Sequence, residues 1–503
     1  MEKIAVIELD YDYLRFLLVD VEGAFFKVSD EIVENLALGE DVKKEGLISI
    51  KNVAHSLKVL KMYRKLCDTN GVTKSVCVAT ENFKQAKNEK SFFEEIYNNT
   101  GFNFQILSQE EQTKAIYNGV INIMDSPKGV MFNVENQSTT IIFYNRRNIL
   151  KSFEINVGAV TLAEKFENEK MTNSEKYTKM VDFAKKEIKK QVGDEQVDSE
   201  TLFVGCGSSF LNLGKLARKA LHYPLNLENN YEVTKQTLEQ VFDFVVGLDL
   251  DKTMKLKGIS TLRADALASG ICIIKAIYDF FNVEKLNISS GGFKNGVIFT
   301  YVVPQVLDKP LSEMINYSLE SIKCMYEKPN NNISQVYALT VILFKQIKVL
   351  HKLPRAYVKP LKIAATLFES GKRVCLERNT DVSFNIILNS DIYSVSHKDL
   401  LLAAFASLCQ DPDALNLSDW IKYKDILSDE DLDAVRKIGM IIKLADILDK
   451  SKNSVVEDIN CDILGDSVIL KSVVKADASF EIMLANKLNP QFKKIFKKNL
   501  QVI

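Results

Sequence analysis

A strand, a polar turn and a second strand follow one another at residues 130–141, VMFNVENQSTTI. In many phosphate-handling proteins a turn of this shape is rich in glycine, so that open backbone amides meet the phosphate. Here the turn is Glu135, Asn136, Gln137 and Ser138, without a glycine. A carboxylate ~4 Å from a phosphate costs on the order of 4 kcal/mol at an effective dielectric constant of 20. The turn therefore combines the shape of a phosphate loop with a charge that opposes phosphate.

The elements that position this turn belong to a repeated pattern. Runs of β-branched and aromatic residues predict strands at residues 3–9, 14–23 and 24–33, followed by alternating helices and strands up to residue 121. The same order restarts near residue 128, with strands at 129–134, 139–145 and 149–156 and later at 201–206 and 284–292. Two halves with matching order predict an internal duplication with a cleft between them.

The chain changes character near Lys309. Beyond it strand signals nearly vanish, and a 3.6-residue apolar period predicts helices within residues 333–353, 357–374, 397–409 and 432–451. This region is large enough for a domain of its own. The sequence therefore predicts an α/β architecture followed by an all-α region.

Composition limits the class of protein. The chain has 503 residues, a net charge of −1 and eight cysteines. A nearly neutral chain has no general field to attract nucleic acid or an anionic membrane, so we expect neither partner. The cysteines form no CxxC pair and the N-terminus lacks the apolar core of a signal peptide, so we expect reduced thiols and a cytoplasmic protein.

Several stretches, in order along the chain, together resemble the exopolyphosphatase and guanosine pentaphosphate phosphatase (Ppx/GppA) family. They include AVIELDYDYLRFLL, LSQEEQTKAIYNGV, VMFNVENQSTT, SFEINVGAVTLAEKF, LFVGCGSS and NISSGGFKNGVI. The resemblance implies two ribonuclease-H-like (actin/sugar-kinase-like) domains at residues 1–124 and 125–305, and an HD-like helical domain at 306–503. It also implies Mg²⁺ as cofactor and polyphosphate or a guanine nucleotide as ligand. A homodimer through the helical domain is a further expectation.

The first strand departs from the family pattern at its end. Where the family has an aspartate followed by small residues, this chain has Glu8 and then Asp10, Tyr11 and Asp12. The longer glutamate moves the carboxylate, and misplacements of ~1 Å can cost ~100-fold in rate. Tyr11 hinders close approach of the backbone to an anion, and the two aspartates repel it. Glu8 is the one candidate metal ligand here.

The strand at residues 129–134 and the turn that follows it depart from the family pattern in a similar way. Asn133 stands at a family aspartate and is neutral, and Glu135 stands at a family glycine. Ser138 and Thr139 are retained as hydroxyl donors for a phosphate. The resemblance therefore implies a weakened metal and phosphate site.

The family's catalytic base is a glutamate that activates the attacking water. Aligning the helix on AIYNGV places Gln112 at this position. Glutamine orients a water but cannot accept its proton, and loss of a general base costs ~10²–10⁴-fold. Glu111 is the alternative base, although one residue along a helix turns a side chain by about 100°.

Other positions are altered less. Lys84 and Lys294 each replace a family arginine, and so offer a point charge instead of a bidentate fork. The run Gly207, Ser208 and Ser209 either contacts a phosphate or forms an ordinary strand-to-helix turn. The retained Arg263 and Asp265 are expected to form a structural ion pair or cap.

The helical region lacks the histidines of an HD metal site. Phe368 and Glu369 stand at the family-like His-Asp position, so we predict no HD metal. His351 and His397 are expected on helix surfaces. The lysine-rich end, residues 487–503, either binds a polyanion or partner helix, or is a solvated face whose Phe492 and Phe496 pack on the body.

Two functions follow from these residues. One is a phosphoanhydride hydrolase that uses Mg²⁺; the other is a non-catalytic descendant that binds or regulates. The simultaneous changes at the base, the metal acids and both amide loops favour the second.

Overall fold

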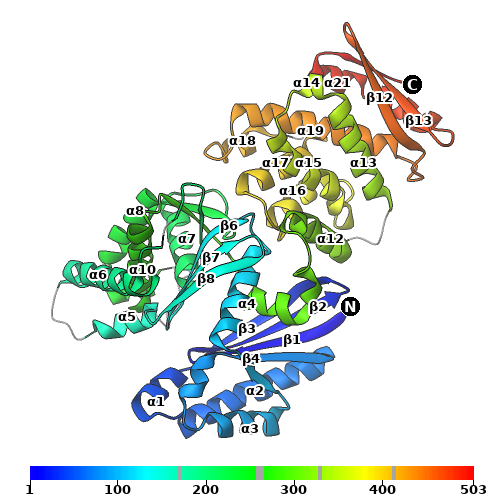
Figure 1. Cartoon of the computed structure of the whole chain (residues 1–503). Helices are drawn as coiled ribbons and strands as arrows, with labels where there is room; N and C mark the ends of the chain where they lie inside the picture. Colours follow the sequence, from blue (N-terminus) through cyan, green and yellow to red (C-terminus); the bar gives the residue numbers. More distant parts are fainter. Residues whose placement is uncertain (168–171, 196, 257–264, 327–330, 411–414) are drawn as a thin grey trace. The chain divides into compact units, whose positions relative to one another are not determined.

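The computed structural model describes residues 1–167, 172–195, 197–256, 265–326, 331–410 and 415–503. The chain divides into two compact units, Met1–Met314 and Ile315–Ile503. In Figure 1 the first unit runs from blue to green and contains two sheets, and the second runs from green to red.

The first sheet has the strand order β3-β2-β1-β4-β5. Its strands are β1 (Glu2–Leu9), β2 (Tyr13–Glu22), β3 (Phe25–Asn35), β4 (Lys74–Ala79) and β5 (Phe104–Ile106). Helices α1 (Leu38–Glu45), α2 (Ile50–Asn70), α3 (Glu89–Thr100) and α4 (Gln109–Ile121) alternate with the later strands. Gly101 ends α3 in the left-handed conformation, as its position after the apolar period predicts.

The second sheet has the strand order β10-β11-β9-β6-β7-β8. Its strands are β6 (Lys128–Val134), β7 (Thr139–Asn145), β8 (Asn148–Ile155), β9 (Leu202–Cys206), β10 (Tyr231–Thr234) and β11 (Lys285–Ile288). Its helices are α5 (Ala159–Lys165), α6 (Asn173–Val192), α7 (Ser208–Ala220), α8 (Lys235–Val246), α9 (Leu250–Met254), α10 (Asp265–Phe281) and α11 (Phe293–Val297).

Five strands of each sheet follow the same order, which agrees with the predicted duplication; the second sheet adds the edge strand β10. In each, the first strand pairs antiparallel with the second and parallel with the fourth in order of sequence. Each sheet has its own apolar core. As a result, Glu8 and Asn133 take equivalent places, each one residue before the end of the first strand of its sheet. The predicted domain limits at 124/125 and 305/306 stay predictions.

The second unit is mainly helical. Its helices are α12 (Met314–Tyr326, beginning on the last residue of the first unit), α13 (Asn331–Gln346), α14 (Lys348–His351), α15 (Val358–Leu367), α16 (Asn379–Asn389), α17 (His397–Leu408), α18 (Leu417–Ile421), α19 (Asp429–Leu448), α20 (Ser479–Asn486) and α21 (Asn489–Phe496). The all-α prediction is wrong near the C-terminus, where β12 (Val456–Leu464), β13 (Ser467–Val474) and β14 (Asn499–Val502) form a three-stranded sheet. Among the described residues, no helix has both the length and the apolar composition needed to cross a bilayer.

The expected surface positions of two histidines are also wrong. His351 and His397 are 1% and 5% exposed. The His351 ring stacks on Phe344 at 4.1 Å between centroids, and its Nδ1 accepts a hydrogen bond from the Leu353 amide. Burial lowers the pKa of His351. By contrast, Phe492 and Phe496 are buried, as expected for aromatics that pack on the body.

Candidate functional site

Glu8 is buried beside one cation. Its position on β1 pairs with Arg15 on β2, and Arg15 Nη1 donates to Glu8 Oε2 at 2.6 Å. The other oxygen, Oε1, is buried without a hydrogen-bond partner among the described residues. Burial raises the pKa of Glu8, and the charge of Arg15 opposes this rise. Glu8 therefore offers one uncommitted oxygen.

An ionic chain continues from this pair to the second half of the unit. Arg15 Nε lies 3.1 Å from Glu31 Oε1, and Lys294 Nζ lies 2.8 Å from Glu31 Oε2. Lys294 comes from α11 and Glu31 from β3. The lysine that replaces a family arginine is thus paired with a carboxylate of the protein itself.

The turn between β1 and β2 concentrates negative charge. Asp10 accepts a hydrogen bond from the Tyr11 amide, and Asp12 accepts one from the Gln137 side chain at 3.1 Å. Burial first, then the charges of Asp12 and Glu135, raise the pKa of Asp10 to about 7. The Tyr11 side chain is buried and its hydroxyl donates to the Asn82 carbonyl, so this ring packs into the first core.

The turn between β6 and β7 is fixed by its backbone. The carbonyls of Glu135 and Asn136 accept hydrogen bonds from the Ala159 and Val160 amides at the start of α5, both at 2.9 Å. Gly158 permits this contact, because a Cβ there would lie 2.4 Å from the Asn136 carbonyl oxygen. The turn therefore presents carbonyls to a helix N-terminus, and the Glu135 amide itself donates to the Ser138 carbonyl.

The Glu135 carboxylate meets a second helix N-terminus. Its Oε2 accepts hydrogen bonds from the Ser208 hydroxyl at 2.9 Å and the Ser208 amide at 3.4 Å, at the start of α7. Gly207 precedes this helix with φ +86°, and a Cβ there would lie 2.8 Å from Glu135 Oε1. Burial raises the pKa of Glu135, and the two bonds from Ser208 oppose this rise.

Asn133 is buried between β7 and β9. Its register partners are Thr140 and Cys206, and its Oδ1 accepts a hydrogen bond from Cys206 Sγ at 3.5 Å. Burial raises the pKa of the Cys206 thiol well above its usual value, so this residue is a thiol donor and not a thiolate.

The hydroxyls and the lysine expected to bind phosphate already have partners in the protein. Ser138 opposes the rise that burial causes in the pKa of Glu154, and Thr139 donates to the Val157 carbonyl at 2.7 Å. Lys84 pairs with Glu81 at 2.8 Å. Ser209 is buried on α7, where a Cβ at Gly270 would lie 2.6 Å from its Oγ.

Gln112 and Glu111 both make local contacts on α4. The side-chain amide of Gln112 (Nε2) donates to the Leu107 carbonyl at 2.9 Å. Glu111 forms a capping box with Ser108, accepting hydrogen bonds from its amide at 2.7 Å and its hydroxyl at 2.9 Å. Glu111 has a structural role in this conformation, and its action as a base stays a prediction.

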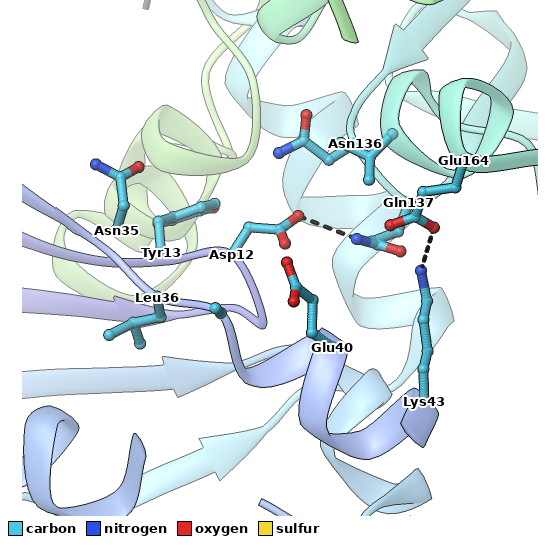
Figure 2. Close-up of a pocket in the computed structure, with 12 residues that line it drawn as sticks. Asp12, Tyr13, Asn35, Leu36, Glu40, Lys43, Asn136, Gln137 and Glu164 are labelled. Carbon is cyan, nitrogen blue, oxygen red and sulfur yellow. Dashed lines mark hydrogen bonds and ion pairs between the residues drawn. The ribbon is translucent and has the colours of Figure 1, made fainter. Parts of the chain in front are cut away.

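A cavity of about 210 Å³ is lined by Asp12 of the β1–β2 turn and by Asn136 and Gln137 of the β6–β7 turn. Figure 2 shows Asp12 bonded to Gln137, and Lys43 of α1 bonded to Glu164 of α5 at 2.7 Å. Glu40 also lines the cavity. Its charged lining is therefore three carboxylates against one lysine that is already paired.

The structure places Asn133 beside Cys206 and Glu135 beside Ser208, whereas Glu8 lies in the other sheet. Sequence reasoning missed Arg15 and Glu31, which form ion pairs next to Glu8. A signal for Arg15 existed. A hairpin that turns at residues 10–12 places Arg15 opposite Glu8. No local pattern could pair Glu135 with Ser208, 73 residues away. Arg263 and the side chain of Asp265 lie outside the described residues.

A model of the Ppx/GppA phosphatase family matches residues 18–303. This match covers more than half of the chain, and the chain belongs to this family. The fold agrees, because a solved Ppx/GppA protein from Aquifex aeolicus superimposes with a TM-score of 0.53 at 23% identity, covering 60% of this chain and 98% of that one.

Two curated relatives extend the comparison. A bifunctional 3-dehydroquinate synthase/phosphatase of Fusobacterium nucleatum is 23% identical over 58% of this chain, which spans 46% of that protein's length. A guanosine-5'-triphosphate,3'-diphosphate pyrophosphatase of Pseudoalteromonas translucida is 19% identical over 78% of each chain. These likenesses support the fold and family, and leave the activity of this chain to a proposal.

The donors present do not fit the Mg²⁺ that the family implies. Mg²⁺ needs oxygen ligands in near-octahedral geometry, commonly one or two carboxylates with waters and phosphates. Glu8 contributes one free oxygen, and Asn133 Oδ1 already accepts from Cys206. Within the described ranges, no three His, Cys, Asp or Glu residues are grouped to hold a metal ion.

Proposed function

We propose that this protein is a non-catalytic Ppx/GppA-family member, a pseudoenzyme that acts by binding or in regulation. The observation that carries the proposal is the Glu135 carboxylate at the N-terminus of α7, bonded to Ser208. A phosphate ~4 Å from this carboxylate would be destabilised by on the order of 4 kcal/mol, which corresponds to roughly a thousandfold in affinity.

Two further features support the proposal. Gln112 stands at the position of the family base, and its side-chain amide donates to the Leu107 carbonyl. A carboxamide does not accept a proton from water, and the loss of a general base costs ~10²–10⁴-fold. Asn133 supplies no charge for a metal at the position equivalent to Glu8.

The alternative function is an exopolyphosphatase or guanosine pentaphosphate phosphohydrolase that releases terminal phosphate with Mg²⁺. It is favoured by family membership and by the relative named as a guanosine-5'-triphosphate,3'-diphosphate pyrophosphatase. In this alternative, Glu111 leaves its capping box and acts as the base.

The remaining expectations belong to the same proposal. Candidate ligands are polyphosphate or a guanine nucleotide, and the candidate assembly is a homodimer through the second unit, for which an HD-like fold is proposed. The proposed location is the cytoplasm, which agrees with eight cysteines that form no disulfide.

Phosphate release decides between the two functions. The full chain is incubated with Mg²⁺ and either long-chain polyphosphate or guanosine pentaphosphate, beside a variant that combines Gln112→Glu, Asn133→Asp and Glu135→Gly. We expect the unmodified protein to stay at the blank and the variant to exceed it. Turnover by the unmodified protein at ordinary enzyme rates of ~1–10³ s⁻¹ would establish the hydrolase.

If hydrolysis is absent, thermal shifts separate a binder from a scaffold. A ligand at ~100 times its dissociation constant adds about 2.7 kcal/mol to the free energy of unfolding. A stabilisation of this size by polyphosphate or a guanine nucleotide identifies a binder. No shift with either identifies a scaffold and removes both ligands from the proposal.

A further inference from the structure

Glu135 makes contacts that a phosphate oxygen would make at the same place. Helix α7 has 13 residues, and its N-terminus favours negative charge through free amides and the helix dipole. The Ser208 hydroxyl and amide both donate to one Glu135 oxygen. An anion is thus already present at this helix end, and it belongs to the protein.

The backbone holds this carboxylate in position. The Glu135 carbonyl accepts a hydrogen bond from Ala159, and the Glu135 amide donates to Ser138. The turn is therefore tied to α5 on one side while its side chain reaches α7 on the other. Gly207 leaves the room for that reach, because any Cβ there would collide with Glu135 and Asn133.

Other acids of the first unit have different partners. Asp12 accepts from the Gln137 side chain, Glu164 pairs with Lys43 and Glu8 pairs with Arg15. Asp12 and Glu164 are seen in these pairs in Figure 2. These three acids are paired with side chains, whereas Glu135 is bonded to the amide and the hydroxyl of Ser208 at the start of α7.

We propose that the Glu135 carboxylate is a built-in anion that occupies the N-terminus of α7 and blocks a phosphate group from binding there. The inference rests on the proposed function in treating the cleft as the descendant of a phosphate site. It predicts that the anion site is filled and not destroyed, so that removing one side chain opens it.

The test measures pyrophosphate binding to the full chain, without metal, by isothermal titration calorimetry. Glu135→Ala removes both the charge and the occupying group, and Glu135→Gln removes the charge while keeping the shape. Asp12→Asn is the matched control, because it removes one negative charge that acts on Glu135 but is bonded to Gln137 and not to α7. The double variant Glu135→Ala, Ser208→Ala removes the freed hydroxyl donor as well.

We expect Glu135→Ala to bind pyrophosphate at least ~10-fold more tightly than the unmodified protein, because screening reduces but does not abolish the effect of a close carboxylate. Glu135→Gln should gain less, Asp12→Asn should stay within ~3-fold, and the double variant should lose most of the gain. Circular dichroism and thermal unfolding show whether each variant is folded. If Glu135→Ala is not folded, the affinity of Glu135→Gln for pyrophosphate, compared with the unmodified protein, tests the inference.

A folded Glu135→Ala variant that binds no more tightly than the unmodified protein would overturn the inference. Equal gains in Asp12→Asn and Glu135→Ala would also overturn it, because general repulsion would then explain both. Failure of the proposed function is a separate result: hydrolysis by the unmodified protein refutes the pseudoenzyme whatever the variants bind.

Discussion

At the scale of single residues, Arg15 offsets the free-energy cost of burying the Glu8 carboxylate. Glu8 is 1% exposed and Arg15 supplies its hydrogen bond. Replacing Arg15 by methionine leaves a buried carboxylate unpaired, which typically costs 3–5 kcal/mol. We predict a loss of about 3 kcal/mol in the free energy of unfolding, measured by urea denaturation.

The double variant Arg15→Met, Glu8→Gln is the control for this prediction. It removes the charge together with its partner, so most of the stability should return. A single Arg15→Met variant as stable as the unmodified protein would show that Glu8 does not depend on Arg15.

Asp10 makes stability depend on pH. Its pKa of about 7 in the folded protein is above the ~3.9 of an unfolded chain. The folded state keeps its proton to a higher pH than the unfolded state. The contribution of Asp10 to the free energy of unfolding therefore decreases as pH rises from ~4 to ~7 and is level above that. Asp10→Asn should remove this decline and stabilise the protein by about 2 kcal/mol at pH 8, with little change at pH 4.

Chemical denaturation at the two pH values checks this prediction. Glu22→Gln, an exposed acid at the end of β2, is the control and should change stability little at either pH. An equal effect of Asp10→Asn at both pH values would mean that the charge of Asp10 is not the cause.

At the scale of elements, the turn into α7 depends on Gly207. Its φ of +86° disfavours any side chain, and a Cβ would lie 2.7 Å from Asn133 Oδ1 and 2.8 Å from Glu135 Oε1. We predict that Gly207→Ala lowers the free energy of unfolding by about 2–3 kcal/mol, measured by urea denaturation. The control is Gly292→Ala, where a Cβ meets nothing within 4 Å.

A loss at Gly207→Ala no larger than at Gly292→Ala would contradict the description of this turn. In that case the Glu135 side chain would have to move away at little cost, and its contact with Ser208 would not be a fixed feature of the fold.

Most elements of the first unit could be predicted from sequence because apolar periodicity and turn residues agree there. Strand β7 was predicted at its observed limits, and α4 within one residue. Strand β13, SVILKSVV, carries the strand pattern and was overlooked, whereas the other missed strands were short or rich in acids. Strand β10 has four residues, β14 has four after a lysine-rich helix, and β12 carries three acids among its nine.

The candidate site was predictable only as a set of residue types. Glu8, Asn133 and Glu135 were identified because they stand at positions of the family motifs that the sequence resembles. Their partners come from tertiary contacts, as with Lys294 and Glu31, which are 263 residues apart. Sequence periodicity reports which face of an element is buried, and it does not report which distant side chain completes a charge pair.

At the scale of the whole molecule, the chain consists of two compact units, and the family match ends at residue 303, within the first. We propose that the acids and internal hydrogen bonds of the first unit leave no place for a metal and a terminal phosphate together. The second unit contains the predicted helices, and Phe368 is buried within it.

The most direct test of this claim is a crystal structure of the full chain grown with Mn²⁺ and pyrophosphate, with the metal located by its anomalous signal. We predict no metal between Glu8 and Asn133, and Glu135 still bonded to Ser208. A Mn²⁺ ion between Glu8 and Asn133, with a phosphate on the Ser208 amide, would contradict it.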